Sequence, residues 1–115
     1  MGNAVGVADL KPAEKSPMVL RLYVAGDAPN SARALANLRR LLADVDPRRY
    51  RLEIIDCLAE PLRALDDGVL VTPTLVRIAP PPAQTVVGTL SALDRVADAL
   101  EIDVITLQPG RVRDP

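Results

Sequence analysis

The stretch from residue 19 to residue 42 changes its apolar period once, and this change limits the fold more than any other feature. In residues 19–25, VLRLYVA, every second side chain is Leu or Val, which predicts a β-strand. After Gly26 and Pro29 the apolar residues recur every three or four positions, which predicts an amphipathic helix capped by Asn30 or Ser31. The expected apolar stripe of this helix is Ala34, Leu35, Leu38, Leu41 and Leu42.

The rest of the chain extends this unit into the order βαβαββα. The patterns predict a strand over 50–56, a short helix over 61–67, two antiparallel strands over 74–78 and 84–88, and a helix over 91–102. Gly68 is expected to end the short helix, and Ser91 with Asp94 three residues later resembles a capping box for the last one. A parallel βαβ half followed by a hairpin and a closing helix predicts an α/β domain with a four-stranded mixed sheet.

The length of 115 residues accommodates one compact domain with a core of its own. Residues 1–17 and 108–115 mix prolines, small residues and charges without periodicity, and we expect them to be tails of a domain that spans 18–107. The sequence contains no apolar run that approaches a membrane span and no signal-peptide pattern, so we expect a cytoplasmic protein without membrane attachment.

Composition excludes several classes of function. The chain has no His and one Cys, so one chain cannot form the usual zinc sites or an internal disulfide. A net charge of -1 and two aromatic residues argue against nucleic-acid binding. Ser31 lacks a histidine base, Asp66 and Asp67 are expected to solvate a helix end, and Cys57 is expected to be a buried structural thiol. We therefore expect no catalytic activity, no cofactor and no metal.

The turn between the first strand and the first helix resembles that of thioredoxin-like proteins. The four residues that would match a redox C-x-x-C motif are Ala28-Pro29-Asn30-Ser31, which contain no sulfur. Thr72-Pro73, just before the third strand, lies where thioredoxin-like folds place a cis peptide bond. The resemblance implies a thioredoxin-like fold and disfavours an oxidoreductase or transferase.

Several segments in register resemble the KaiB family of bacterial circadian clock proteins. They are residues 22–35 (LYVAGDAPNSARAL), Ile55-Asp56, Thr72 to Leu75 (TPTL), Pro80 to Pro82, and Gly88 to Ser91 (GTLS). The resemblance covers about residues 19–102. It implies a non-enzymatic protein with either a thioredoxin-like fold or the ground-state fold of the family, βαββααβ, in an oligomer such as a dimer or tetramer.

The resemblance also implies partners. KaiB proteins bind the ATPase ring of KaiC and, in some systems, KaiA, so the expected function is regulation of a circadian or timing system through a KaiC-like ATPase. The alternative is a thioredoxin-like adaptor or sensory module for another partner, such as a histidine kinase or a stress regulator. This alternative is favoured by Glu53, Gly68, Gln84 and Thr85, which stand where relatives commonly carry Lys or Arg, because charge decides which partners are tolerated.

The candidate partner-interface residues are Arg33, Glu53 and Arg77. We expect Arg33 and Arg77 to be exposed, with little effect on stability when substituted. The candidates for a change of fold are Thr72, Pro73, Pro80, Pro81, Pro82 and Ala99. The three consecutive prolines have two interpretations, a stiff hairpin loop or a slow isomerisation gate. Ala99 stands where relatives often have Gly and favours a helix, whereas residues 102–107, IDVITL, favour a strand.

Overall fold

The structure is a computed structural model that describes residues 17–102. Its centre is a four-stranded mixed sheet in the order β2-β1-β3-β4, in which β1 and β2 are parallel and the other neighbours are antiparallel. The strands are β1 (Met18–Val24), β2 (Tyr50–Asp56), β3 (Thr74–Ala79) and β4 (Gln84–Val87). The predicted α/β class, the sheet and the βαβαββα order are confirmed.

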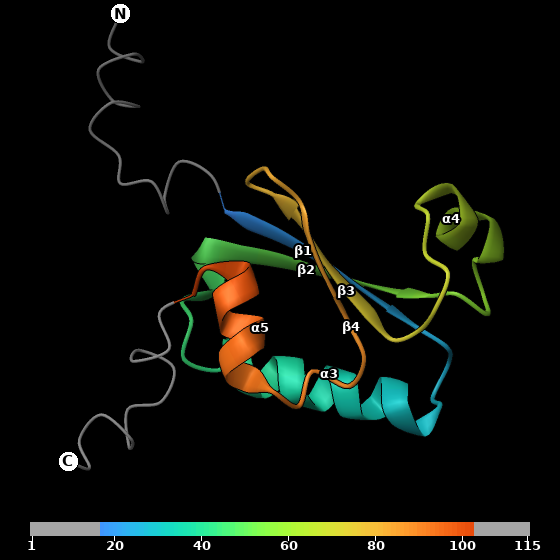
Figure 1. The fold of residues 1–115 in the computed structure, drawn as a ribbon, viewed down its shortest axis with the longest axis horizontal. Helices are drawn as coiled ribbons and strands as arrows, with labels where there is room; N and C mark the ends of the chain where they lie inside the picture. Colours follow the sequence, from blue (N-terminus) through green and yellow to red (C-terminus); the bar gives the residue numbers. More distant parts are fainter. Residues whose placement is uncertain (1–16, 103–115) are drawn as a thin grey trace, which may run out of the picture.

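Within the described residues, helices α3 and α4 and one short 3-10 helix lie between strands, and helix α5 follows the last strand (Figure 1). They are α3 (Pro29–Leu42), η1 (Pro47–Arg49), α4 (Pro61–Asp66) and α5 (Leu93–Leu100). Helices α3 and α5 lie side by side, whereas α4 lies apart from both, at the carboxyl ends of β1 and β2 (Figure 1). The two sides of the sheet are therefore covered very unequally.

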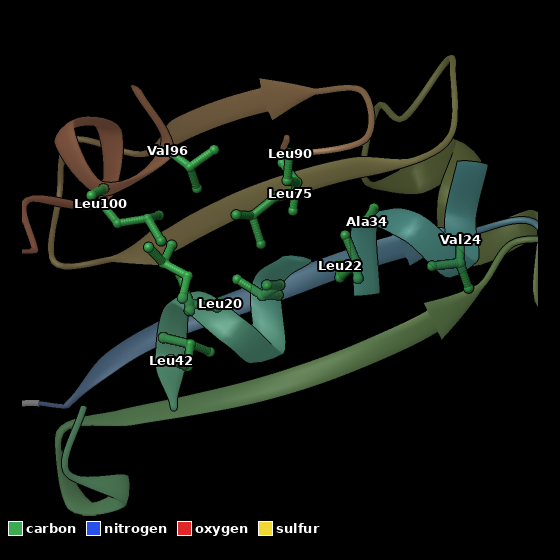
Figure 2. Close-up of a cluster of buried hydrophobic side chains, with 12 residues drawn as sticks. Leu20, Leu22, Val24, Ala34, Leu42, Leu75, Leu90, Val96 and Leu100 are labelled. Carbon is green, nitrogen blue, oxygen red and sulfur yellow. The ribbon is translucent and has the colours of Figure 1, made fainter. Parts of the chain in front are cut away.

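The main core lies between the sheet and the pair α3 and α5. Leu20, Leu22 and Val24, the alternate residues of β1, point toward these helices (Figure 2). Burying one such side chain contributes roughly 1.5–3 kcal/mol, so this face supplies most of the apolar stabilisation. The other core residues are Ala34, Leu38, Leu41, Leu42, Leu75, Leu90, Val96, Ala97 and Leu100.

The opposite face of the sheet has a much smaller buried set. Tyr23 and Ile55 are register partners on β1 and β2, and Ala64 is the buried residue of α4. The Tyr23 hydroxyl donates a hydrogen bond of 2.7 Å to Oδ2 of Asp67, which follows α4. Because successive residues of a strand point to opposite faces, Tyr23 places α4 on the side of the sheet away from α3 and α5.

The predicted N-caps of the first and last helices are wrong. Helix α3 begins at Pro29 with Ala28 as its N-cap, and the buried Ser31 hydroxyl instead accepts a hydrogen bond of 3.0 Å from the Ala25 N–H. Helix α5 begins two residues later than predicted, with Ala92 as its N-cap. Ser91 therefore lies outside the helix, and a capping box needs its Ser at the N-cap itself.

The Thr72-Pro73 peptide is cis, as predicted, and the Ala79-Pro80 and Pro81-Pro82 peptides are cis as well. Residues 80–83, which we call the proline link, join β3 to β4 outside the ladder, as expected for prolines, which have no N–H. Three predicted segments lie wholly or mostly outside the described residues. They are the predicted strand over 102–107 from residue 103 onward, residues 1–16 of the predicted N-terminal tail, and the predicted tail over 108–115.

Candidate docking surface

The three residues predicted for a partner interface do not lie on one surface. Arg33 is exposed on α3. Glu53 is exposed on β2 and pairs with Arg63 of α4, which places it on the other side of the sheet. Arg77 is only 1% exposed. The structure thus leaves Arg33 and Glu53 available to a partner on opposite sides of the sheet.

The expected exposure of Arg77 is wrong. Its guanidinium donates to the carbonyl oxygen of Pro82 at 2.9 Å and to that of Leu100 at 3.5 Å, and it lies 3.6 Å from a carboxylate oxygen of Glu101. Its buried Nε has no hydrogen-bond partner among the described residues. The physical reason is that alternate residues of β3 face the core. Arg77 pairs with Leu20 in the ladder and points to the same core-facing side of the sheet, where the end of α5 covers it.

A group of exposed apolar side chains surrounds α4. Leu62 and Leu65 lie three residues apart on the helix and therefore share one of its faces. They are 74% and 66% exposed, and the turns that flank the helix add further side chains that are at least half exposed. We call this group the α4 surface; it consists of Leu58, Leu62, Leu65, Leu70 and Val71.

Polar contacts hold α4 against the sheet. Arg63 forms an ion pair of 2.8 Å with Glu53 on β2, and Glu53 also accepts from Arg21 on β1 at 3.1 Å. Burial, followed by the hydrogen bond to Asp67, raises the pKa of Tyr23 above its ordinary 10.0, so its hydroxyl stays protonated and donates. These contacts attach α4 while leaving its leucines in contact with water.

The turn before α4 is built around Asp56 at the end of β2. One carboxylate oxygen of Asp56 accepts from the N–H groups of Gly26 and Leu58, each at 2.9 Å, and these bonds lower the pKa of Asp56. Gly26 has a φ of +55°, and a Cβ built on it would lie 3.3 Å from Cδ1 of Leu58. Gly26 thus permits the close approach that places Leu58 at the edge of the α4 surface.

Cys57 precedes Leu58 in the sequence, at the edge of this surface. Cys57 is half-buried rather than fully buried as predicted, and burial, with the negative charges of Asp56 and Glu60, raises the pKa of its thiol. A protonated thiol is a poor nucleophile at neutral pH. Within residues 17–102 there is no group of three or more metal-ligating side chains. The same part of the chain contains no helix long and apolar enough to cross a membrane.

Sequence reasoning missed the α4 surface. The available signal was a pair of leucines three positions apart in a six-residue helix that also carries Arg63 and Asp66. Apolar residues at helical spacing usually pack into a core, however, and the pattern alone does not reveal that Ala64 is the buried residue of α4 while the leucines are exposed. The solvent exposure of the leucines depends on how little of the sheet α4 covers.

Comparison with known proteins agrees with the segments found in the sequence. The KaiB domain family model matches residues 21–102. The chain belongs to the KaiB family. It is 44% identical over 88 residues to the circadian clock oscillator protein KaiB of Rippkaea orientalis, covering 76% of this chain and 85% of that protein. The corresponding Nostoc punctiforme protein is 44% identical over 96 residues, covering 84% and 92%.

Solved structures support the fold of this KaiB-family protein. The N-terminal domain of Synechococcus elongatus SasA has a TM-score of 0.63 and 29% identity, covering 80% of this chain and 88% of that domain. Mitochondrial thioredoxin 3 of Saccharomyces cerevisiae has a TM-score of 0.59 and 16% identity, covering 75% and 81%. The likeness to thioredoxin concerns the fold alone, and the predicted thioredoxin-like class is confirmed.

Proposed function

We propose that this KaiB-family protein is a non-enzymatic regulator of a timing system, and that it docks on the ATPase ring of a KaiC-like partner through the α4 surface. Family membership supports the type of partner, since the similar relatives are named as circadian clock oscillator proteins. The observation that carries the location is the exposure of Leu58, Leu62 and Leu65 around one weakly covered helix. Contiguous exposed apolar residues mark interaction sites.

The exposed leucines provide enough apolar area to matter for affinity. Leu58, Leu62, Leu65 and Leu70 are between 66% and 87% exposed. At roughly 1.5–3 kcal/mol for a fully buried leucine, covering all four contributes about 4–9 kcal/mol before the entropic cost of association. Contacts of this size anchor a protein–protein interface, and the surrounding residues supply its rim.

The remaining interface candidates belong to the same proposal. Glu53 borders the α4 surface through its ion pair with Arg63. Arg33 is exposed on α3 and would meet a second partner, such as a KaiA-like protein, on the other side of the sheet. Arg77 acts indirectly, by holding the proline link and the end of α5 in place. A dimer or tetramer, and a role for Ala99 in a change of fold, stay predictions.

The second candidate function is a thioredoxin-like adaptor or sensory module for another signalling partner, such as a histidine kinase. Glu53 and Gly68 favour it, because they stand near the α4 surface at positions where the family resemblance implies basic residues. Such a change of charge selects against the usual partner and favours a different one. This candidate and the first share the α4 surface and differ in what binds it.

The test is binding of the purified protein to a purified KaiC-like ATPase ring, in separate ATP-bound and ADP-bound preparations, measured as a dissociation constant. The double variant Leu62→Gln/Leu65→Gln removes the apolar face of α4 while keeping helix-forming side chains of similar length. We expect its affinity to fall about 30-fold to 150-fold, from roughly 1–1.5 kcal/mol lost for each leucine.

The matched control is Ile54→Gln, which alters an exposed apolar residue on β2 that shares the other face with Leu52. We expect it to keep wild-type affinity. If the double variant bound the ring as tightly as the wild type and Ile54→Gln do, the α4 surface would not be part of the interface. A wild-type protein that binds no KaiC-like ring but captures a histidine kinase through Leu62 and Leu65 would favour the second candidate.

A further inference from the structure

The residues around the α4 surface carry an excess of negative charge. Within residues 17–102, five carboxylates lie on or beside α4 and the end of β2, and two guanidiniums form ion pairs with three of them. The carboxylates are those of Glu53, Asp56, Glu60, Asp66 and Asp67, and the guanidiniums are those of Arg21 and Arg63.

The two arginines already have carboxylate partners. Arg63 lies 2.8 Å from Glu53, 3.8 Å from Glu60 and 3.9 Å from Asp67. Arg21 lies 3.1 Å from Glu53 and 3.7 Å from Asp67. A partner that approaches α4 therefore meets leucines bordered by carboxylates, with the nearby positive charge already paired inside the protein.

We propose that the α4 surface binds a protein surface that is apolar at its centre and basic at its border. This inference rests on the proposed function, because it specifies the chemistry of the partner that the same leucines contact. Leu62 and Leu65 supply the apolar contact, and Glu60 and Asp66 attract Lys or Arg side chains at the border. Complementary charge at a rim raises the association rate and rejects acidic surfaces.

A second copy of this chain does not fit these requirements. The basic part of the described chain is the end of α3 with η1 and the start of β2, where Arg39, Arg40, Arg49 and Arg51 are exposed. Within residues 39–51 no large apolar side chain is exposed. This basic end would face the carboxylates of another copy but would leave its leucines in water, so we assign the α4 surface to a different protein.

The first arm of the test uses the KaiC-like ring. Glu60→Lys/Asp66→Lys reverses two border charges without altering the leucines, and Asp98→Lys on α5 is the matched control on the far side of the sheet. We expect the double variant to bind about 3-fold to 10-fold more weakly, mainly through slower association, and the control to bind like the wild type. Raising NaCl from about 0.05 M to about 0.3 M should weaken wild-type binding more than binding of the double variant.

The second arm does not depend on the ring. Two synthetic amphipathic peptides, one of Leu and Lys and one of Leu and Glu, are titrated into labelled protein while amide chemical shifts are recorded. We expect the Leu/Lys peptide to shift residues 58–71, the Leu/Glu peptide to leave them unchanged, and Glu60→Lys/Asp66→Lys to invert this preference. If the wild type binds the Leu/Lys peptide in this way but no ring, the proposed function fails and this inference stands.

Two results would overturn the inference, and the first of them leaves the proposed function intact. The first is ring binding that depends on Leu62 and Leu65 but is unaffected by the charge reversals, with both peptides shifting residues 58–71 equally. The second is a concentration-dependent dimer in sedimentation that Leu62→Gln/Leu65→Gln converts to a monomer, because it would assign the α4 surface to a second copy.

Discussion

Replacing Arg77 by Glu should destabilise the protein strongly, although a charge reversal at a surface arginine changes stability little. Arg77 is 1% exposed and donates to the carbonyl oxygens of Pro82 and Leu100. A glutamate at this position would place a carboxylate against two carbonyl oxygens and near the carboxylate of Glu101, 3.6 Å from the present guanidinium. No donor would replace the lost guanidinium.

The expected magnitude follows from these contacts. Hydrogen bonds to a charged group contribute about 1.5–3 kcal/mol, and leaving a buried charge without its partner costs about 3–5 kcal/mol. The pair with Glu101 adds little, because the Glu101 side chain is 68% exposed. We therefore expect Arg77→Glu to lower the free energy of unfolding by about 3–5 kcal/mol. Arg77→Met, which removes the unpartnered Nε together with the charge, should lower it by about 1–2 kcal/mol.

Urea unfolding monitored by circular dichroism measures both values. With a slope near 1 kcal/mol per M for a small domain, Arg77→Glu should shift the midpoint down by about 3–5 M or leave the protein unfolded in buffer. Arg33→Glu is the matched control, since it makes the same change on the exposed side of α3. A loss below about 0.5 kcal/mol for Arg77→Glu would refute the reasoning, because that is the range of exposed substitutions.

Four further results are expected. Arg33→Glu should change the unfolding free energy by less than about 0.5 kcal/mol and weaken partner binding. If binding is unchanged, Arg33 is not part of the interface. Cys57→Ser should keep partner binding. The wild-type thiol should react slowly with a disulfide reagent at pH 7 because its pKa is raised, and rapid modification would contradict that expectation. The pKa of Asp56 is lowered in the folded protein, so its contribution to stability should be present above its ordinary pKa of 3.8 and lost as pH falls through the folded value. The unfolding free energies of the wild type and Asp56→Ala, measured by urea titration, should therefore converge below about pH 4. Ala99→Gly should destabilise α5 by about 0.8–1 kcal/mol, seen as faster amide exchange in that helix, and unchanged exchange would argue against a role in the balance of folds.

The elements follow from local patterns in the sequence. The alternation in residues 19–25 and 50–56 places one strand residue in two on the core face, and the 3.6-residue stripe of α3 faces the same core. These periods depend only on backbone geometry, so they can be identified without knowledge of the tertiary structure. The end of α4 at Gly68 has the same local origin, since Gly68 has a φ of +76°.

Caps and burial depend on contacts between different elements of the fold. Ser31 was a reasonable cap by sequence, but the N–H of Ala25 lies where its hydroxyl can accept a bond across the turn. The sequence predicts an exposed Arg77, but the end of α5 and the proline link cover it. In both cases the side chain bonds to a group outside its own helix or strand, and this contact replaces the one expected from the local pattern.

The sequence alone determined the order of strands and helices, the absence of histidine and of a second cysteine, and the motifs that mark the KaiB family. Only the tertiary structure decided that Arg77 is buried and that Leu62 and Leu65 are exposed. The physical reason is that a period assigns a side chain to a face of its element, whereas exposure depends on whether another element covers that face. Helices α3 and α5 cover one side of the sheet, and α4 covers only the end of the other, which leaves its own leucines open to a partner.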